Sequence, residues 1–148
     1  MTSAAIRPKA VCVVRRGGQV LVSGARDSAK GETFYGPLGG GIEFGEHAAD
    51  AVRREMMEEL GAEIVDVRLL GVLENVFTYE GRPGHEIVFV FIARFADQSL
   101  YDRDELRWTE SDGTEWLAEW VPLERFAAGG PPLYPTGLYD LLRPDPEQ

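Results

Sequence analysis

The stretch from Ile87 to Phe95 (IVFVFIARF) restricts the fold of this chain more than any other segment. It is apolar at nearly every position, whereas a strand with one face in water alternates apolar and polar residues. The pattern therefore predicts a central strand that is buried on both faces. With helical and further strand signals around it, it indicates an α/β fold in which a mixed sheet is covered on both faces.

Shorter signals predict the other elements. Gly17 and Gly18 are typical of a hairpin turn between two short apolar runs. Further strands are expected at residues 10–14, 19–22, 64–77 and 115–121, helices at 46–60, 122–127 and 137–142, and loops at 23–37 and 96–114. The length of 148 residues fits one domain, residues 1–148.

The net charge of −10 is concentrated in two segments. Residues 40–62 carry six acidic and two basic residues, residues 97–119 carry eight and two, and the rest of the chain balances at eleven of each. A generic nucleic-acid or anionic-membrane binder needs a basic face. Neither a nucleic-acid polymer nor a membrane is therefore an expected partner, and the two acidic segments become the lead to function.

The single cysteine, Cys12, excludes an internal disulfide and a cysteine zinc cluster. It lies in an apolar run and is expected to be a small core residue. The first ten residues have no apolar signal core, and no apolar run approaches the length of a membrane span. A cytoplasmic protein is therefore expected.

The helix expected at 46–60 places three carboxylates on one face. At about 100° per residue, Glu55, Glu58 and Glu59 share an arc of roughly 100°, beside an apolar stripe. Like charges at this spacing destabilise a helix by a few tenths of a kcal/mol per pair. The face is either simply solvated or it binds a hard cation such as Mg²⁺, which takes carboxylates together with substrate phosphates.

Four glycines precede this helix between Leu38 and Gly45. A tight glycine loop lets backbone groups approach a metal or a phosphate without interference from side chains.

Taken together, the glycines and the acids resemble the Nudix box, in which Gly, five residues, Glu and seven residues precede Arg-Glu-apolar-any-Glu-Glu-any-Gly-apolar. All seven fixed identities match: Gly40, Glu46, Arg54, Glu55, Glu58, Glu59 and Gly61. There are two departures. Ala62 is smaller than the usual closing residue, and the chain reads Pro37-Leu38-Gly39-Gly40 where members often have Pro-Gly-Gly. The resemblance implies a Nudix-type α/β/α sandwich with a mixed β-sheet.

The resemblance also implies an activity. Nudix enzymes use Mg²⁺ or Mn²⁺ to hydrolyse a nucleoside diphosphate linked to another moiety, so the expected partner is a small-molecule nucleotide: a nucleotide sugar, ADP-ribose, a dinucleoside polyphosphate or a nucleoside triphosphate. Carried over by position, Glu55, Glu58, Glu59 and the carbonyl of Gly39 are the implied metal ligands. Arg54 would orient a glutamate, and Gly40, Glu46 and Gly61 would support the geometry of the loop and the helix. Nudix domains often form homodimers.

The general base stays open between a box glutamate and an acid from the second acidic segment. The candidates there are Glu105, Glu110, Asp112 and Glu115. Glu115 is preferred because it opens the strand that leads into Glu119–Leu123, a run often seen late in Nudix domains. The catalytic set is thus Glu58, Glu59, Arg54 and Glu115.

Substrate contacts are less constrained by the sequence. Arg26 and Arg82 are candidates for phosphate contacts, and Tyr35 and Tyr79 for stacking, although each also fits plain surface or core packing. Tyr79 follows the box by 17 residues, near a tyrosine associated with dinucleoside polyphosphate hydrolases. The proline typical of ADP-ribose pyrophosphatases is absent there.

Two other functions compete with hydrolysis as explanations of the acidic segments. A non-catalytic nucleotide sensor on the same fold would require the loss of box residues, and the box is intact. An acidic Ca²⁺-binding protein would need an EF-hand loop, and residues 102–112 lack its alternating Asp and central Gly.

Overall fold

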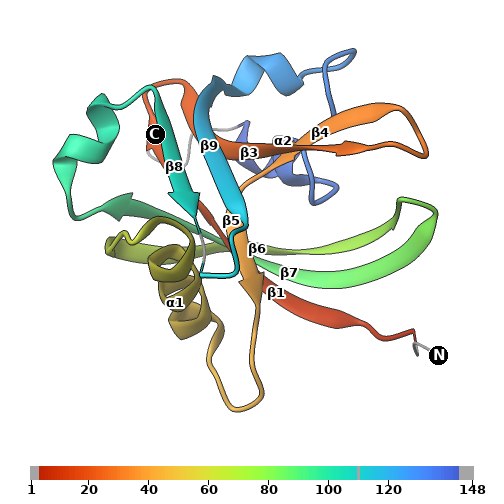
Figure 1. The fold of residues 1–148 in the computed structure, drawn as a ribbon, viewed down its shortest axis with the longest axis horizontal. Helices are drawn as coiled ribbons and strands as arrows, with labels where there is room; N and C mark the ends of the chain where they lie inside the picture. Colours follow the sequence, from red (N-terminus) through yellow and green to blue (C-terminus); the bar gives the residue numbers. More distant parts are fainter. Residues whose placement is uncertain (1–3, 110, 144–148) are drawn as a thin grey trace.

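Two twisted sheets cross at the centre of the computed structural model, which describes residues 4–109 and 111–143 (Figure 1). The first sheet has the strand order β5-β1-β7-β6. Its strands are β5 (Leu38–Gly41), β1 (Arg7–Val13), β7 (Arg82–Phe95) and β6 (Ile64–Tyr79). β1 runs parallel to β7, while the other neighbours are antiparallel, so the expected mixed sheet is confirmed.

The second sheet is antiparallel and has the order β2-β3-β9-β8, with β4 paired to β3. Its strands are β2 (Arg15–Arg16), β3 (Gln19–Asp27), β9 (Glu115–Pro122), β8 (Glu105–Thr109) and β4 (Glu32–Gly36). The helices are α1 (Ala48–Leu60), η1 (Gln98–Asp102), η2 (Leu123–Phe126) and α2 (Leu138–Leu142). None of the helices in the described part of the chain is long and apolar enough to cross a membrane.

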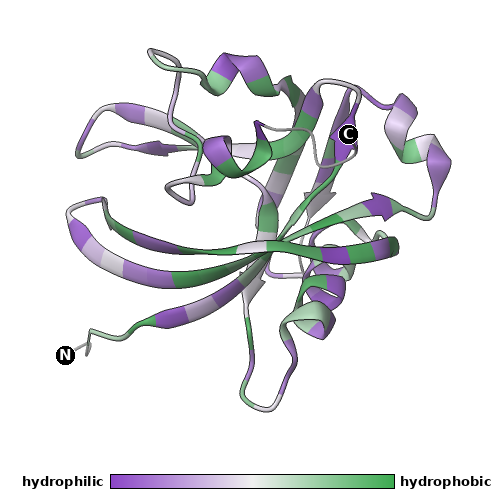
Figure 2. Ribbon diagram, turned by 180° about the vertical axis from the view of Figure 1, so that it is seen from behind, coloured by the Kyte–Doolittle hydropathy of each residue, from purple (hydrophilic) through white to green (hydrophobic). Residues whose placement is uncertain are grey.

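The prediction of a central strand at residues 87–95 is confirmed, since this part of β7 is buried or half-buried on both faces except at the exposed Arg94. β7 lies between β1 and β6, and its side chains divide between two buried clusters. Phe91 and Phe95 pack in the cluster beneath α1, and Val88 and Val90 in the cluster that includes η2 and α2. Strands β3 and β9 contribute to both clusters. The apolar stretches, green in Figure 2, therefore gather where the two sheets cross.

The loop expected at 23–37 is wrong, because β3 continues to Asp27 and β4 returns as its partner, with Ser23 opposite Gly36. This hairpin projects away from the core (Figure 1), so its outward positions remain polar and its sequence lacks an apolar alternation. The loop expected at 96–114 is also wrong, since this segment contains η1 and β8. β8 is an edge strand whose alternate residues are exposed and polar, so its sequence lacks a strong apolar signal.

Two boundaries also differ from expectation. Helix α1 begins at Ala48 rather than at Glu46. It ends at Leu60 as expected and is capped by Gly61, whose φ of +63° is the left-handed value that glycine adopts without strain. The glycine turn at 17–18 joins β2 to β3, while β1 belongs to the other sheet.

Candidate active site

Helix α1 lies against the glycine strand β5, and the first glycine of that strand fixes how closely β5 approaches β1. Gly39 pairs with Val11 and has a φ of +155°. A Cβ at Gly39 would overlap the carbonyl oxygen of Ala10 and would lie 2.6 Å from the Cα of Val11. Only glycine fits this position, because both the dihedral and the space exclude a side chain.

The second glycine makes room for a carboxylate. A Cβ at Gly40 would lie 2.5 Å from the carboxyl carbon of Glu55 and 2.6 Å from each of its oxygens. The carboxylate of Glu55 therefore lies directly over Gly40. Glu59 is also held against this strand, since its Oε1 accepts a hydrogen bond from the backbone N–H of Gly39 at 3.1 Å. Glu59 is only 4% exposed, which marks it as a carboxylate that the fold positions.

Arg54 connects the carboxylates of this region. Its Nε and Nη2 donate to Glu46 at 2.8 and 2.9 Å, and its Nη1 donates to Glu55 at 3.0 Å and to Glu58 at 3.3 Å. Nη2 also donates to the carbonyl of Gly41 at 3.0 Å. One planar guanidinium thus ties the loop before α1, the glycine strand and the acidic face of the helix together.

These contacts shift two pKa values. The hydrogen bond from Arg54, with help from the backbone N–H of Glu43, lowers the pKa of Glu46 to about 2. The hydrogen bond to Glu46, together with the neighbouring Glu55, raises the pKa of Arg54 above its ordinary value. Both groups are therefore charged at neutral pH, and their pairing fixes how the chain enters α1.

The donor groups of this region fit a hard divalent cation. The side chains are all carboxylates, which Mg²⁺ prefers, and the missing Cβ of Gly40 leaves space around the Glu55 oxygens. Within the described residues, no three His, Cys, Asp or Glu side chains already form a metal-binding group. Instead, Arg54 bonds to both Glu55 and Glu58, and Gly39 bonds to Glu59.

The second acidic segment lies beside the end of α1. The turn between β8 and β9 comes next to α1 in Figure 1, and a Cβ at Gly61 would lie 3.3 Å from the Trp108 ring. Glu115 is exposed at the start of β9, opposite Thr109. Within residues 4–109 and 111–143, no hydrogen bond or ion pair joins Glu115 to the box.

Two of the other candidates for the general base have local partners. Glu105 pairs with Arg107 at 3.0 Å. Asp112 accepts the backbone N–H of Thr114 at 2.8 Å, a bond that lowers its pKa. Glu110 lies outside the described residues.

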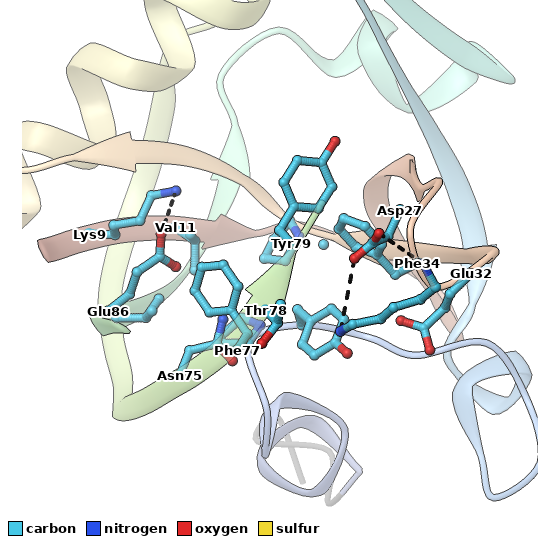
Figure 3. A pocket seen from close by; sticks show the side chains of 16 residues that line it. Lys9, Val11, Asp27, Glu32, Phe34, Asn75, Phe77, Thr78, Tyr79 and Glu86 are labelled. Atoms are coloured by element: carbon cyan, nitrogen blue, oxygen red, sulfur yellow. Dashed lines mark hydrogen bonds and ion pairs between the residues drawn. The ribbon is translucent and has the colours of Figure 1, made fainter. Parts of the chain in front are cut away.

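A pocket of about 270 Å³ opens between two hairpins that belong to different sheets (Figure 3). The β3–β4 hairpin contributes Asp27, Glu32 and Phe34, and the β6–β7 hairpin contributes Phe77 and Tyr79. Strand β1 supplies Lys9 and Val11, and the segment before α2 supplies Tyr134 and Pro135. Both hairpin ends meet where the N–H and the hydroxyl of Ser28 donate to the Glu80 carboxylate, each at 2.5 Å.

Of the four predicted substrate contacts, only Tyr79 lines this pocket. Tyr35 follows Phe34 in β4, and because side chains alternate along a strand, it packs on Phe126 instead, with ring centroids 5.4 Å apart. Arg26 precedes the pocket residue Asp27 and is exposed. Arg82 is exposed at the start of β7.

The sequence did not predict several of the pocket residues, among them Lys9, Asp27, Asn75 and Tyr134. A correct hairpin for residues 19–36 would have shown that Asp27, Glu32 and Phe34 share one region. Tyr134 is distant in sequence and has no comparable signal.

Known proteins share this fold. The crystal structure of a MutT NUDIX hydrolase from Burkholderia pseudomallei superposes with a TM-score of 0.61 at 26% identity, covering 81% of this chain and 85% of that one. An ADP compounds hydrolase, at 18% identity and a TM-score of 0.55 over 83% of this chain and 60% of that one, shares the fold. These neighbours show that the chain has the fold of the MutT NUDIX hydrolase.

The NUDIX domain model matches residues 6–140, so the chain belongs to the Nudix family. An RNA pyrophosphohydrolase of Hydrogenovibrio crunogenus is 26% identical over 114 residues, 69% of each protein. An NAD-capped RNA hydrolase of Mycobacterium tuberculosis is 33% identical over 110 residues, covering 69% of this chain but 34% of that enzyme. The chain is a Nudix pyrophosphohydrolase, and hydrolases of this family generally use divalent metals.

Proposed function

We propose that this chain hydrolyses a pyrophosphate bond in a nucleoside diphosphate linked to another moiety, with Mg²⁺ or Mn²⁺ as cofactor. The observation that carries the proposal is the contact between α1 and β5, where Glu55 lies over Gly40 and Glu59 bonds to Gly39. Both the site and the substrate's pyrophosphate are anionic. A divalent cation between them would neutralise charge and lower the pKa of an attacking water.

In this proposal, the metal ligands are Glu55, Glu58, Glu59 and the carbonyl oxygen of Gly39. Arg54 is a positioning residue, since its guanidinium holds Glu55 and Glu58 through Nη1 and is itself held by Glu46. Gly40 keeps space for the Glu55 carboxylate, and Gly61 ends the helix so that Glu58 and Glu59 lie in its last turn.

The base that takes a proton from water is either a box glutamate, Glu58 or Glu59, or Glu115. Glu58 has the more exposed side chain of the Arg54-bound pair, at 53% against 15% for Glu55, and could accept a proton from solvent. Glu115 stands at the β8–β9 end that neighbours α1. Replacing each residue by glutamine removes the basic oxygen while its size stays the same.

We further propose that the pocket between the β3–β4 and β6–β7 hairpins takes the nucleoside part of the substrate. A nucleobase offers two apolar faces for stacking, and Phe34, Phe77 and Tyr79 provide aromatic faces. The names of the relatives add RNA ends and dinucleotides to the substrates worth testing.

The test is a panel of substrates with each metal. It holds ADP-ribose, nucleotide sugars, dinucleoside polyphosphates, NAD, nucleoside triphosphates and 5′-triphosphorylated RNA, and release of phosphate or nucleoside monophosphate is measured. On the best substrate, we expect Glu58→Gln and Glu59→Gln each to remove most metal-dependent turnover while circular dichroism stays unchanged. Glu63→Gln is the matched control, since Glu63 is exposed just after the box. Near-wild-type rates in both box variants would overturn the assignment.

A further inference from the structure

Three aromatic side chains from separate elements form the walls of the pocket. The Phe34 ring of β4 lies 5.8 Å from the Tyr79 ring and 5.4 Å from the Tyr134 ring, measured between centroids. The interplanar angles are 82° and 77°. Rings at near right angles present their electron-rich faces in different directions around a shared space, and such faces attract cations.

A fourth ring is held in place by a glycine. Phe77 of β6 lies over Gly84 on the neighbouring strand β7, where a Cβ would overlap the ring. Its position therefore depends on a missing side chain rather than on a flexible contact. Figure 3 shows Phe77 and Tyr79 on one side of the pocket and Phe34 on the other.

The charges that line the pocket do not balance. Three carboxylates, Asp27, Glu32 and Glu86, face two lysines. Lys9 pairs with Glu86 at 3.4 Å, and Lys30 lies 4.0 Å from Asp27. Within residues 4–109 and 111–143, the Glu32 carboxylate has neither an ion pair nor a hydrogen bond. The pocket thus carries one negative charge in excess.

A buried amide supplies a hydrogen-bond donor. Asn75 is 5% exposed, and its Oδ1 accepts both the backbone N–H and the hydroxyl of Thr136 at 3.2 Å. The two bonds assign the oxygen to the Thr136 side, so the amide nitrogen faces away from it. That nitrogen has no partner among the described residues, although Asn75 lines the pocket. A donor of this kind at the pocket wall favours a ligand that brings an acceptor oxygen.

We propose that the pocket selects a nucleoside whose heterocycle carries a positive charge and a carbonyl oxygen, of the type of a pyridinium carboxamide or an N-methylated guanine. The inference rests on the proposed function only in placing the nucleoside part of the substrate here. The aromatic faces and the Glu32 carboxylate attract the cationic ring, and the Asn75 amide donates to the carbonyl. A neutral base gains the stacking alone, and a moiety with a further phosphate meets the excess negative charge.

The experiment measures binding of free nucleosides without metal, so that it does not depend on hydrolysis. Isothermal titration calorimetry compares nicotinamide riboside with its dihydro form, which has the same carboxamide and ribose but no positive charge. A second pair, 7-methylguanosine against guanosine in mildly acidic buffer, keeps a purine ring in both members. We expect the cationic member to bind about tenfold more tightly in each pair.

Variants test the groups that carry the preference. Glu32→Gln removes the excess charge with little change in size and should reduce the preference to about twofold, while the affinity for guanosine stays the same. Tyr79→Leu should weaken both cationic ligands. Glu63→Gln, an equal charge change outside the pocket, should leave every affinity unchanged. 1-Methyladenosine, a cationic base without a carbonyl, should bind more weakly than 7-methylguanosine because it offers Asn75 no acceptor.

Equal affinities within each pair would overturn the inference, as would a preference that survives in both Glu32→Gln and Tyr79→Leu. The result is separable from the proposed function. If metal-dependent hydrolysis is found without a charge preference, the inference fails and the proposed function stands. If the charge preference is found without hydrolysis, the pocket is confirmed and the proposed function fails.

Discussion

Three consecutive glycines in β5 should respond in three different ways to the same substitution. The informative one is Gly40→Ala, whose new Cβ would lie 2.5 Å from the carboxyl carbon of Glu55. Carbon atoms in contact stay about 3.5 Å apart, so the carboxylate would have to move by about 1 Å. A misplacement of about 1 Å at a reacting site lowers the rate on the order of 100-fold. We therefore expect kcat/KM to fall by about two orders of magnitude.

The neighbouring glycines are matched controls. A Cβ at Gly41 would meet no heavy atom of the described chain within 4 Å, so Gly41→Ala should keep near-wild-type activity and stability. Gly39→Ala should prevent folding instead, because its Cβ would overlap the backbone of β1 and its φ of +155° is strained for alanine.

The assay measures metal-dependent turnover on the best substrate together with a thermal melt for each variant. We expect Gly40→Ala to melt within a few degrees of wild type, since the atom that must move is the far end of a side chain. Equal activity of Gly40→Ala and Gly41→Ala would show that the position of Glu55 does not matter. Loss of fold in Gly40→Ala would show that the contact supports packing rather than the site.

Three further expectations concern other parts of the molecule. The pKa of Glu46 is lowered to about 2 by Arg54, so the stability that this carboxylate contributes is complete above its ordinary pKa of 4.5 and is lost as the pH falls toward 2. The loss of folded protein with falling pH, followed by circular dichroism, should therefore be less steep over this range in Glu46→Gln than in the wild type. Identical curves for the two proteins would contradict the pairing. Burial raises the pKa of the Cys12 thiol to about 12, so iodoacetamide at neutral pH should label the protein in urea but not in its native state; rapid native labelling would refute this. Gly84→Ala should displace the Phe77 ring and weaken nucleoside binding severalfold, while turnover of a substrate analogue without a base stays the same. Loss of both binding and turnover would indicate general unfolding.

The sequence was sufficient where one signal dominates. The nearly continuous apolar run at residues 87–95 predicted the burial of this part of β7 on both faces, and the box predicted both the helix and its glycine stop. The role implied for Arg54 was orientation of one glutamate, whereas its guanidinium donates hydrogen bonds to three, Glu46, Glu55 and Glu58. The spacing of residues in the sequence predicts which of them share a helix face, but it does not predict which groups a long side chain such as that of Arg54 contacts.

The pocket was less predictable because it depends on strand register. Whether Phe34 or Tyr35 faces the pocket is a matter of one residue, and only the pairing of β3 with β4 decides it. The polar composition of residues 23–37 hid that pairing. Asn75 and Thr136 are 61 positions apart in the sequence, so no local sequence pattern predicts their contact.

The contact between Ser28 and Glu80 has a consequence for how fast molecules can enter and leave. The two pocket walls belong to different sheets, and the pairing within each hairpin is complete without the other. Their ends are joined by the two exposed hydrogen bonds of this contact and by the edge of one ring pair. Two exposed hydrogen bonds contribute roughly 1–2 kcal/mol, so the walls should part in roughly 3–15% of molecules at any moment. Hairpin ends move in nanoseconds to microseconds, and exchange of the nucleoside should therefore be much faster than a typical turnover.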